Sequence, residues 1–411
     1  MEATSDRGDN RRLLGSAQSK LHPLITQKFQ SPLSKDIFFE SHLSTEALPF
    51  LADYQIYDRV VVPGACYLSL LLTTTSLTCS QAGCQLTNIV FTQALAIPEG
   101  QTCTVQTMLT PQEENLNFQV ISFATHPADN TSVSQTQPYT LHAEGNLASW
   151  HDTLPKLSVQ DIQGRCSQVV EGTTIYQKLE QRHIQLGEYF RWIETAWVGN
   201  QEFLICLKQP TFVRDADSYP LYPSLIDACF QLIIADAITH SATDTKTWLP
   251  LQIERFSYMG HSPGETLWCH GQLRPNQGEG ADRQIWDLLL FNVEGQGMAR
   301  IEGFEVRQAN PEVVLRTITT IESAPTAKDD QILAQIKVAL EAEREQLLRT
   351  YLQEQVAHLL GMKTSEIDVQ QHLNYMGLDS LVAVNLRNRL QTKLSVHIPI
   401  TKFMEELTIA D

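Results

Sequence analysis

Two long apolar helices, each beginning directly after a proline, constrain the fold of this chain more than any other feature. The first is predicted over Ala65–Leu77, after Pro63, and the second over Ser224–Thr239, after Pro223. Proline is favoured at the first position of a helix, and a helix that is apolar on most faces is buried. Each helix interrupts a block of β-branched and aromatic segments that reads as strands. We therefore predict a duplicated α+β architecture in which a curved sheet wraps each helix.

Composition divides the rest of the chain into segments. Residues 1–21 are polar and predict a flexible tail, and residues 22–150 and 168–307 form the two strand-rich blocks. Residues 308–328, rich in Pro, Thr, Ser and Ala, predict a linker. Apolar residues at helical spacing predict a long helix and a small all-α module over 329–411.

Charge and apolar content exclude several classes of protein. The chain is 42% apolar, so it can build packed cores, and its net charge of −17 disfavours nucleic acid and anionic membranes as partners. It has no apolar run long enough to span a bilayer and no signal peptide, which favours a cytoplasmic location. Its eight cysteines lack CxxC or metal-type spacing, so we expect reduced, buried thiols and no metal.

A serine near the end of the chain follows a glycine that permits a tight turn before a helix. At a helix start, Ser380 is either an ordinary N-cap or an anchor for an anionic group, which helix amides favour. Its surroundings resemble the phosphopantetheine attachment motif of polyketide synthase acyl carrier proteins: Gly377, Leu378, Asp379, Ser380 and Leu381. The resemblance implies a covalent 4'-phosphopantetheine on Ser380. Because the chain stops at Asp411, where the family's last helix begins, we expect a C-terminally truncated carrier.

The two strand-rich blocks resemble the dehydratase domains of polyketide synthases over residues 22–307. The resemblance is carried by the segments Pro49–Ala65 and Leu221–Gln231 and by Trp248–Pro250. It implies a double hotdog, in which two curved sheets each surround a central helix. Such domains remove water from a carrier-bound β-hydroxyacyl thioester: a histidine takes the α-proton and an aspartic acid protonates the leaving hydroxyl. The acid falls on Asp227, with Gln231 one helical turn later.

The resemblance fails where the base is expected. The family pattern is His, three residues, Gly, four residues, Pro; here Tyr54 and Asp58 replace the first two, and Pro63 is retained. Since the pKa values of tyrosine and histidine differ by about 3.5 units, Tyr54 is a poor base at neutral pH. Two substrate-lining positions also depart from the family. Tyr222 replaces the histidine before Pro223, and of a Tyr-Gly-Pro loop only Gly187 remains.

Three hypotheses follow. In the leading one, Ser380 carries an acyl thioester and the dehydratase-like domain is inactive, with Asp227 a structural residue and Tyr54 a filler of the pocket. In the second, Asp227 and Tyr54 still act as a hydro-lyase, isomerase or cyclase on carrier-bound substrates. In the third, the domain is a structural dimerisation module.

These hypotheses also predict partners for the chain and raise the question of an alternative base. Expected partners are a phosphopantetheinyl transferase, the ketosynthase and acyltransferase domains of the same assembly line, and a second copy of the chain in a homodimer. Four other histidines could in principle replace the base, although none occupies a matching position: His42, His151, His183 and His240.

Overall fold

The structure is a computed structural model, and part of the chain is described here. The described residues are 21–78, 83–112, 115–123, 139–150, 152–235, 247–260, 264, 266–275, 282–311, 314–315, 318–319, 341–360, 363–364, 367–372, 386, 390 and 408–409.

The two post-proline helices form where the sequence predicts them. Helix α1 spans Gly64–Ser76 with Pro63 as its N-cap, and α4 spans Pro223–Ile234 with Pro223 in the first turn. Almost every residue of both helices is buried, and the two helices pack against each other. The hydroxyl of Ser69 on α1 donates to the carbonyl of Leu221, 2.7 Å away, which ties the first helix to the segment that opens the second.

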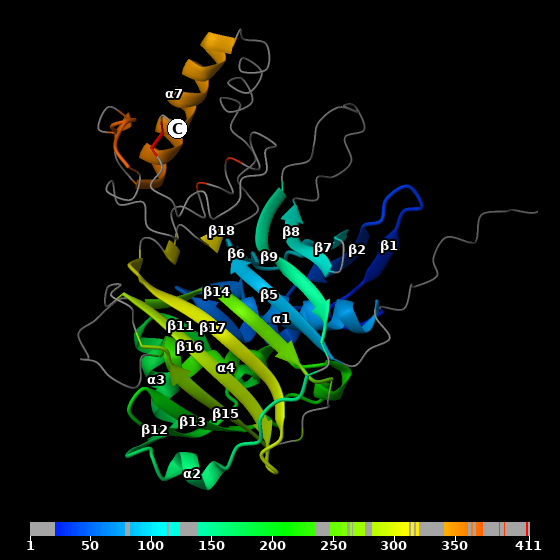
Figure 1. The fold of residues 1–411 in the computed structure, drawn as a ribbon, viewed down its shortest axis with the longest axis vertical. Coiled ribbons are helices and arrows are strands. Elements are labelled where there is room, and N and C mark those ends of the chain that lie inside the picture. Colours follow the sequence, from blue (N-terminus) through cyan, green and yellow to red (C-terminus); the bar gives the residue numbers. More distant parts are fainter. Residues whose placement is uncertain are drawn as a thin grey trace, which may run out of the picture.

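A single antiparallel sheet of 13 strands surrounds these helices (Figure 1). Its first six strands come from the N-terminal block, in the order β1 (Gln27–Gln30), β2 (Ile37–Leu43), β7 (Cys103–Gln112), β8 (Asn115–Phe123), β9 (Tyr139–Ser149) and β5 (Cys84–Phe91). The next seven come from the C-terminal block, in the order β14 (Thr247–Tyr258), β17 (Gly297–Ala309), β16 (Arg283–Asn292), β15 (Thr266–Leu273), β13 (Glu202–Lys208), β12 (Ile193–Val198) and β10 (Gln168–Glu171).

The two blocks meet at one seam, where β5 pairs antiparallel with β14. The register there places Leu86 opposite Phe256 and Ile89 opposite Ile253. All four side chains are buried in the common core, so the two sheets form one continuous surface over α1 and α4. The predicted double hotdog is confirmed in this form.

A smaller sheet contains Tyr54, the first residue of strand β3. Its five strands run in the order β11 (Ile184–Leu186), β3 (Tyr54–Ile56), β4 (Arg59–Val62), β6 (Ala94–Ala96) and β18 (Ile318–Thr319). Strand β18 pairs parallel with β6, and Val314 and Ile318 belong to the main hydrophobic core. Part of the segment read from composition as a linker thus completes this sheet.

The described residues also form several helices besides α1 and α4. They are α2 (Val159–Gln163), α3 (Gly172–Gln181), α7 (Glu341–Leu360) and the 3₁₀ helices η1 (Pro49–Asp53), η2 (Glu188–Phe190) and η3 (Ala216–Ser218). Helix α7 lies within the region where a long helix is expected from residue 329 onward, and its Tyr351 and Val356 are buried, whereas residues 320–340 lie outside the described residues.

The described cysteines form no disulfide with one another, and every one except the half-buried Cys166 is buried. No helix within the described ranges is long and apolar enough to cross a membrane.

Candidate functional site

Asp227 lies in the second turn of α4 and is 3% exposed. Its Oδ2 accepts a hydrogen bond from Nε2 of Gln231, one turn later, at 2.8 Å. Burial raises the pKa of this carboxyl to about 7, and the amide hydrogen bond opposes that rise. The carboxyl is therefore close to half protonated at neutral pH, which is the condition for a general acid.

Tyr54 opens strand β3 and is also buried. Burial raises the pKa of its phenol well above the usual value, and the nearby carboxylate of Asp227 raises it further. The structure thus brings together the two residues that the sequence places at the acid and base positions. At pH 7 the pair therefore holds a protonated phenol beside a carboxyl that is about half protonated.

A short loop closes over Tyr54 from the C-terminal block. The ring of Phe190, the last residue of η2, lies 5.1 Å from the Tyr54 ring, centroid to centroid. The carbonyl of Phe190 accepts a hydrogen bond of 3.0 Å from Nε2 of Gln231, the same nitrogen that donates to Asp227. The remaining amide oxygen of Gln231 is buried and has no hydrogen-bond partner.

The glycine of this loop is required by its neighbour. Gly187 donates its backbone N–H to the carbonyl of Asp53 at 2.8 Å. A Cβ at position 187 would lie 2.2–2.4 Å from the Asp53 carboxyl group, so any side chain there would displace that carboxyl. The same carboxyl accepts a hydrogen bond of 3.0 Å from the N–H of Tyr189. Asp53 was not singled out from the sequence, and nothing in its residue type distinguishes it from a surface carboxylate.

The other predicted site positions hold backbone or packing roles. Asp58 lies in the two-residue turn between β3 and β4 with φ 58°, next to Tyr57 with φ 49°, and its Oδ1 accepts a hydrogen bond from Gln185. Positive φ at both central residues is the geometry of a type I′ hairpin, where glycine or aspartate is tolerated.

Tyr222 precedes α4 and is 1% exposed. It packs among aromatic rings of both blocks: Phe50, Trp192 and Tyr219.

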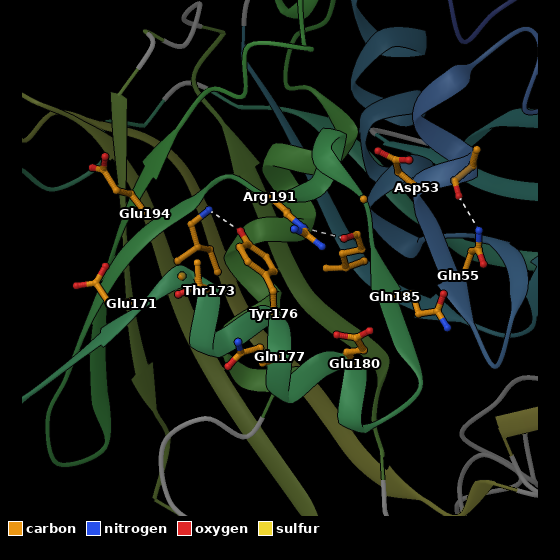
Figure 2. A pocket seen from close by; sticks show the side chains of 15 residues that line it. Asp53, Gln55, Glu171, Thr173, Tyr176, Gln177, Glu180, Gln185, Arg191 and Glu194 are labelled. Atoms are coloured by element: carbon orange, nitrogen blue, oxygen red, sulfur yellow. Dashed lines mark hydrogen bonds between the residues drawn. The ribbon is translucent and has the colours of Figure 1, made fainter.

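A pocket of about 750 Å³ lies outside the buried pair. Figure 2 shows its labelled lining: Asp53 and Gln55 come from the N-terminal block, and Tyr176, Gln177 and Glu180 come from α3. Its lining includes Leu186 and Gly187 but neither Tyr54 nor Asp227. The hydroxyl of Tyr176 accepts a hydrogen bond of 2.8 Å from the N–H of Ile193. Burial is the main cause that raises the pKa of this phenol, and the charge of Asp227 also raises it. The pocket and the buried pair therefore share a wall.

The four alternative histidines and the carrier serine either have other contacts or lie outside the described residues. His42 contacts Glu40, and His183 stacks on Tyr57, while His151 and His240 lie outside the described residues. Neither His42 nor His183 contributes to the shift in the pKa of Asp227, which comes from burial and from the hydrogen bond to Gln231. The carrier motif residues 377–381, including Ser380, also lie outside the described residues.

Among the described residues, no group of three His, Cys, Asp or Glu side chains is arranged to hold an ion.

Family models match most of the chain. Residues 22–123 match the model described as the polyketide synthase dehydratase domain, and residues 155–316 match the polyketide synthase dehydratase N-terminal domain. Residues 350–411 match the phosphopantetheine attachment site.

Similar curated proteins are polyketide synthases much longer than this chain. Polyketide synthase PksM of Bacillus subtilis is 23% identical over 337 residues, which is 79% of this chain and 8% of that protein. A mycocerosic acid synthase-like polyketide synthase of Mycobacterium tuberculosis is 23% identical over 286 residues, 67% of this chain and 13% of that protein.

Solved structures agree over the two blocks. The dehydratase domain from the CurJ module of curacin polyketide synthase is 45% identical with a TM-score of 0.66, covering 72% of this chain and 100% of that one. The CurK dehydratase of the same synthase is 26% identical with a TM-score of 0.62, covering 71% and 100%. The chain thus belongs to the polyketide synthase dehydratase family, as a double-hotdog dehydratase domain joined to the phosphopantetheine-attachment domain of a modular polyketide synthase.

Proposed function

We propose that this chain carries an acyl group as a thioester on a phosphopantetheine arm at Ser380, and that its dehydratase domain does not dehydrate. The arm supplies the thiol that holds the acyl group. The residues of the dehydratase domain supply a fold and a closed site. The proposed partners are a phosphopantetheinyl transferase, ketosynthase and acyltransferase domains of the same assembly line, and a second copy of the chain.

The phenol at position 54 is the observation that carries this proposal. Elimination of water needs a group that removes the α-proton while a second group protonates the departing hydroxyl. Tyr54 is buried, and both burial and the Asp227 charge raise its pKa, so its hydroxyl keeps its proton at neutral pH. The acid is therefore retained as Asp227, but its partner cannot accept a proton.

Inactive variants of related dehydratases support this interpretation. A histidine-to-phenylalanine mutant of the CurJ dehydratase is inactive, and so are a histidine-to-phenylalanine mutant and an aspartate-to-asparagine mutant of the CurK dehydratase. In this chain an aromatic residue, Tyr54, stands at the position where the family resemblance puts the base histidine.

A direct assay tests the inactive-domain proposal. A β-hydroxyacyl thioester of pantetheine is incubated with the native chain and with Asp227→Asn, and the enoyl product is followed by its absorbance. We expect both proteins to match the buffer blank. Elimination by the native chain that disappears in Asp227→Asn would overturn the proposal.

The carrier proposal has its own experiment. A phosphopantetheinyl transferase with coenzyme A should add the mass of one arm to the native chain and none to Ser380→Ala. An unmodified native chain that gives a folded circular dichroism spectrum would reject attachment at Ser380.

A second candidate function rests on the pKa of Asp227, which burial raises to about 7. A half-ionised carboxyl beside a protonated phenol could move a double bond or close a ring on a carrier-bound enoyl thioester, with Tyr54 donating to the thioester carbonyl. Incubation with a β,γ-enoyl thioester distinguishes the two functions, because a shift to the conjugated isomer, lost in Asp227→Asn, would favour this candidate.

A further inference from the structure

Part of the wall between the surface pocket and the buried pair is formed by Leu186 and the loop Gly187–Phe190. On the outer side, the pocket is lined by Asp53, Leu186 and Gly187. On the inner side, Leu186 pairs with Tyr54 across β11 and β3, and the Phe190 ring lies against the Tyr54 ring. This segment therefore lies between the pocket and Tyr54.

One residue, Asp53, holds this loop at two positions, through its side chain at Tyr189 and through its backbone at Gly187. The carboxylate of Asp53 accepts the N–H of Tyr189, and the backbone carbonyl of Asp53 accepts the N–H of Gly187. A charge-assisted bond to a backbone N–H is among the stronger hydrogen bonds in proteins. The missing side chain at Gly187 lets the Asp53 carboxyl sit directly against the loop.

The inner end of the loop is linked to the Asp227 carboxyl through Gln231. Gln231 donates the hydrogens of one amide nitrogen to Phe190 and to Asp227 at once. A displacement of Phe190 would consequently remove the cover of Tyr54 and free one of the two bonds that orient the Gln231 amide.

We propose that Asp53 is a positioning residue that latches the loop Gly187–Phe190 shut, so that an acyl thioester entering the surface pocket is kept from Asp227 until the latch opens. The inference rests on the proposed function in taking the pocket's ligand to be a carrier-borne acyl chain. It concerns access to the site, whereas the proposed function concerns the missing base.

Chemical labelling of carboxyl groups measures this access without any turnover. The full chain is treated with a water-soluble carbodiimide and glycine ethyl ester, and modification of Asp227 is quantified by peptide mass spectrometry. We expect Asp227 to be protected in the native chain, and its labelling rate to rise about tenfold in Asp53→Ala, as loss of one charge-assisted hydrogen bond implies. Asp53→Asn, which keeps an acceptor without the charge, should give an intermediate rate.

Two controls separate a latch from a general loosening. Glu305, a buried carboxylate held by Arg283 and Arg307, should remain unlabelled in every variant. Asp58→Ala removes a carboxylate from the neighbouring hairpin and should leave Asp227 protected.

A second variant keeps the proposal testable if Asp53→Ala does not fold. Gly187→Ala drives a methyl group into the Asp53 carboxyl and should expose Asp227 in the same way. Continued protection of Asp227 in the folded variants, or equal labelling of Glu305, would overturn the latch. Dehydration by Asp53→Ala would instead refute the missing-base proposal and leave the latch standing.

Discussion

In the proposed function, the phenol at position 54 is the reason that the domain does not dehydrate. Because Asp227 and Gln231 are hydrogen-bonded nearby, we expect Tyr54→His to restore a base beside the proposed acid. General base catalysis contributes about 10²–10⁴-fold, so we expect elimination from a β-hydroxyacyl thioester to rise by that order. Tyr54→Phe, which keeps the ring and removes the hydroxyl, is the matched control and should stay at the blank. A rate in Tyr54→His equal to that control would mean that more than the base is missing.

The buried carboxyl of Asp227 also makes stability depend on pH. Its folded pKa of about 7 lies above its unfolded value near 3.8, so the folded state holds the proton more tightly. Stability contributed by protonated Asp227 is present below pH 3.8 and is lost as the pH rises through 7. Between pH 5 and 7.5, Asp227→Asn should gain about 2–3 kcal/mol of unfolding free energy relative to the native chain. Urea titrations at both pH values measure this, and a constant difference would contradict it.

His142 titrates in the opposite direction. Its Nδ1–H donates to the carbonyl of Gln93 and its Nε2 accepts the hydroxyl of Ser122, both at 2.7 Å. Burial lowers the pKa of this neutral ring from 6.5 to about 4, so the unfolded chain takes the proton first as the pH falls. The native chain should therefore lose roughly 2 kcal/mol of stability at pH 5 through this group. His142→Gln should lose correspondingly less between pH 7 and pH 5 in the same urea titrations; an identical loss would exclude this role.

Sequence reasoning reaches some of these residues and misses others for a physical reason. Tyr54 and Asp227 lie in recognisable segments, so their pairing could be predicted. Asp53 and Phe190 could not, since their roles come from contacts between η1 and η2, which are 135 or more residues apart in the chain. Asp58 stands where the family pattern has glycine, and its φ of 58° lies in the region that glycine favours, but the sequence analysis did not predict this backbone conformation.

Among the helices, too, some could be predicted from the sequence and others could not. Helices α1 and α4 follow from a proline and an uninterrupted apolar run. Helix α3 was missed because it is short and half polar, with only Gly172, Ile175 and Leu179 buried, so its apolar face is too narrow to read without its partner. Helix α2 was missed inside a polar connection, although Ser158 caps it by accepting the N–H of Asp161.

Because strand β18 pairs with β6, we expect the dehydratase domain to extend beyond residue 307. A chain cut after Arg307 lacks Val314 and Ile318, which are 1% and 5% exposed in the core. Burying each of these side chains contributes roughly 1.5–3 kcal/mol. A protein of residues 22–320 should therefore unfold at a clearly higher urea concentration than one of residues 22–307. Equal midpoints would show that the exit strand adds nothing to the fold.

For the whole molecule, the duplication in the sequence predicts two separate strand-rich blocks. In the structure, strands β5 and β14 join these blocks into one sheet. The sequence offered no sign of the pairing between β5 and β14, because both strands are equally apolar on their inner faces and register depends on the partner. Residues 22–320 should accordingly unfold in one transition, with fluorescence and circular dichroism giving coincident curves. Two separated transitions would indicate that the halves are independent.

The β5–β14 seam has a consequence for anyone who recombines assembly lines. A crossover placed in the connection between the two blocks would join a foreign β5 to this chain's β14 along a ladder running from Cys84–Tyr258 to Val90–Gln252. Mismatched side chains along that ladder would leave two open strand edges, which are templates for aggregation. Productive chimeras should exchange the dehydratase domain as a unit, with junctions before His22 and after Thr319.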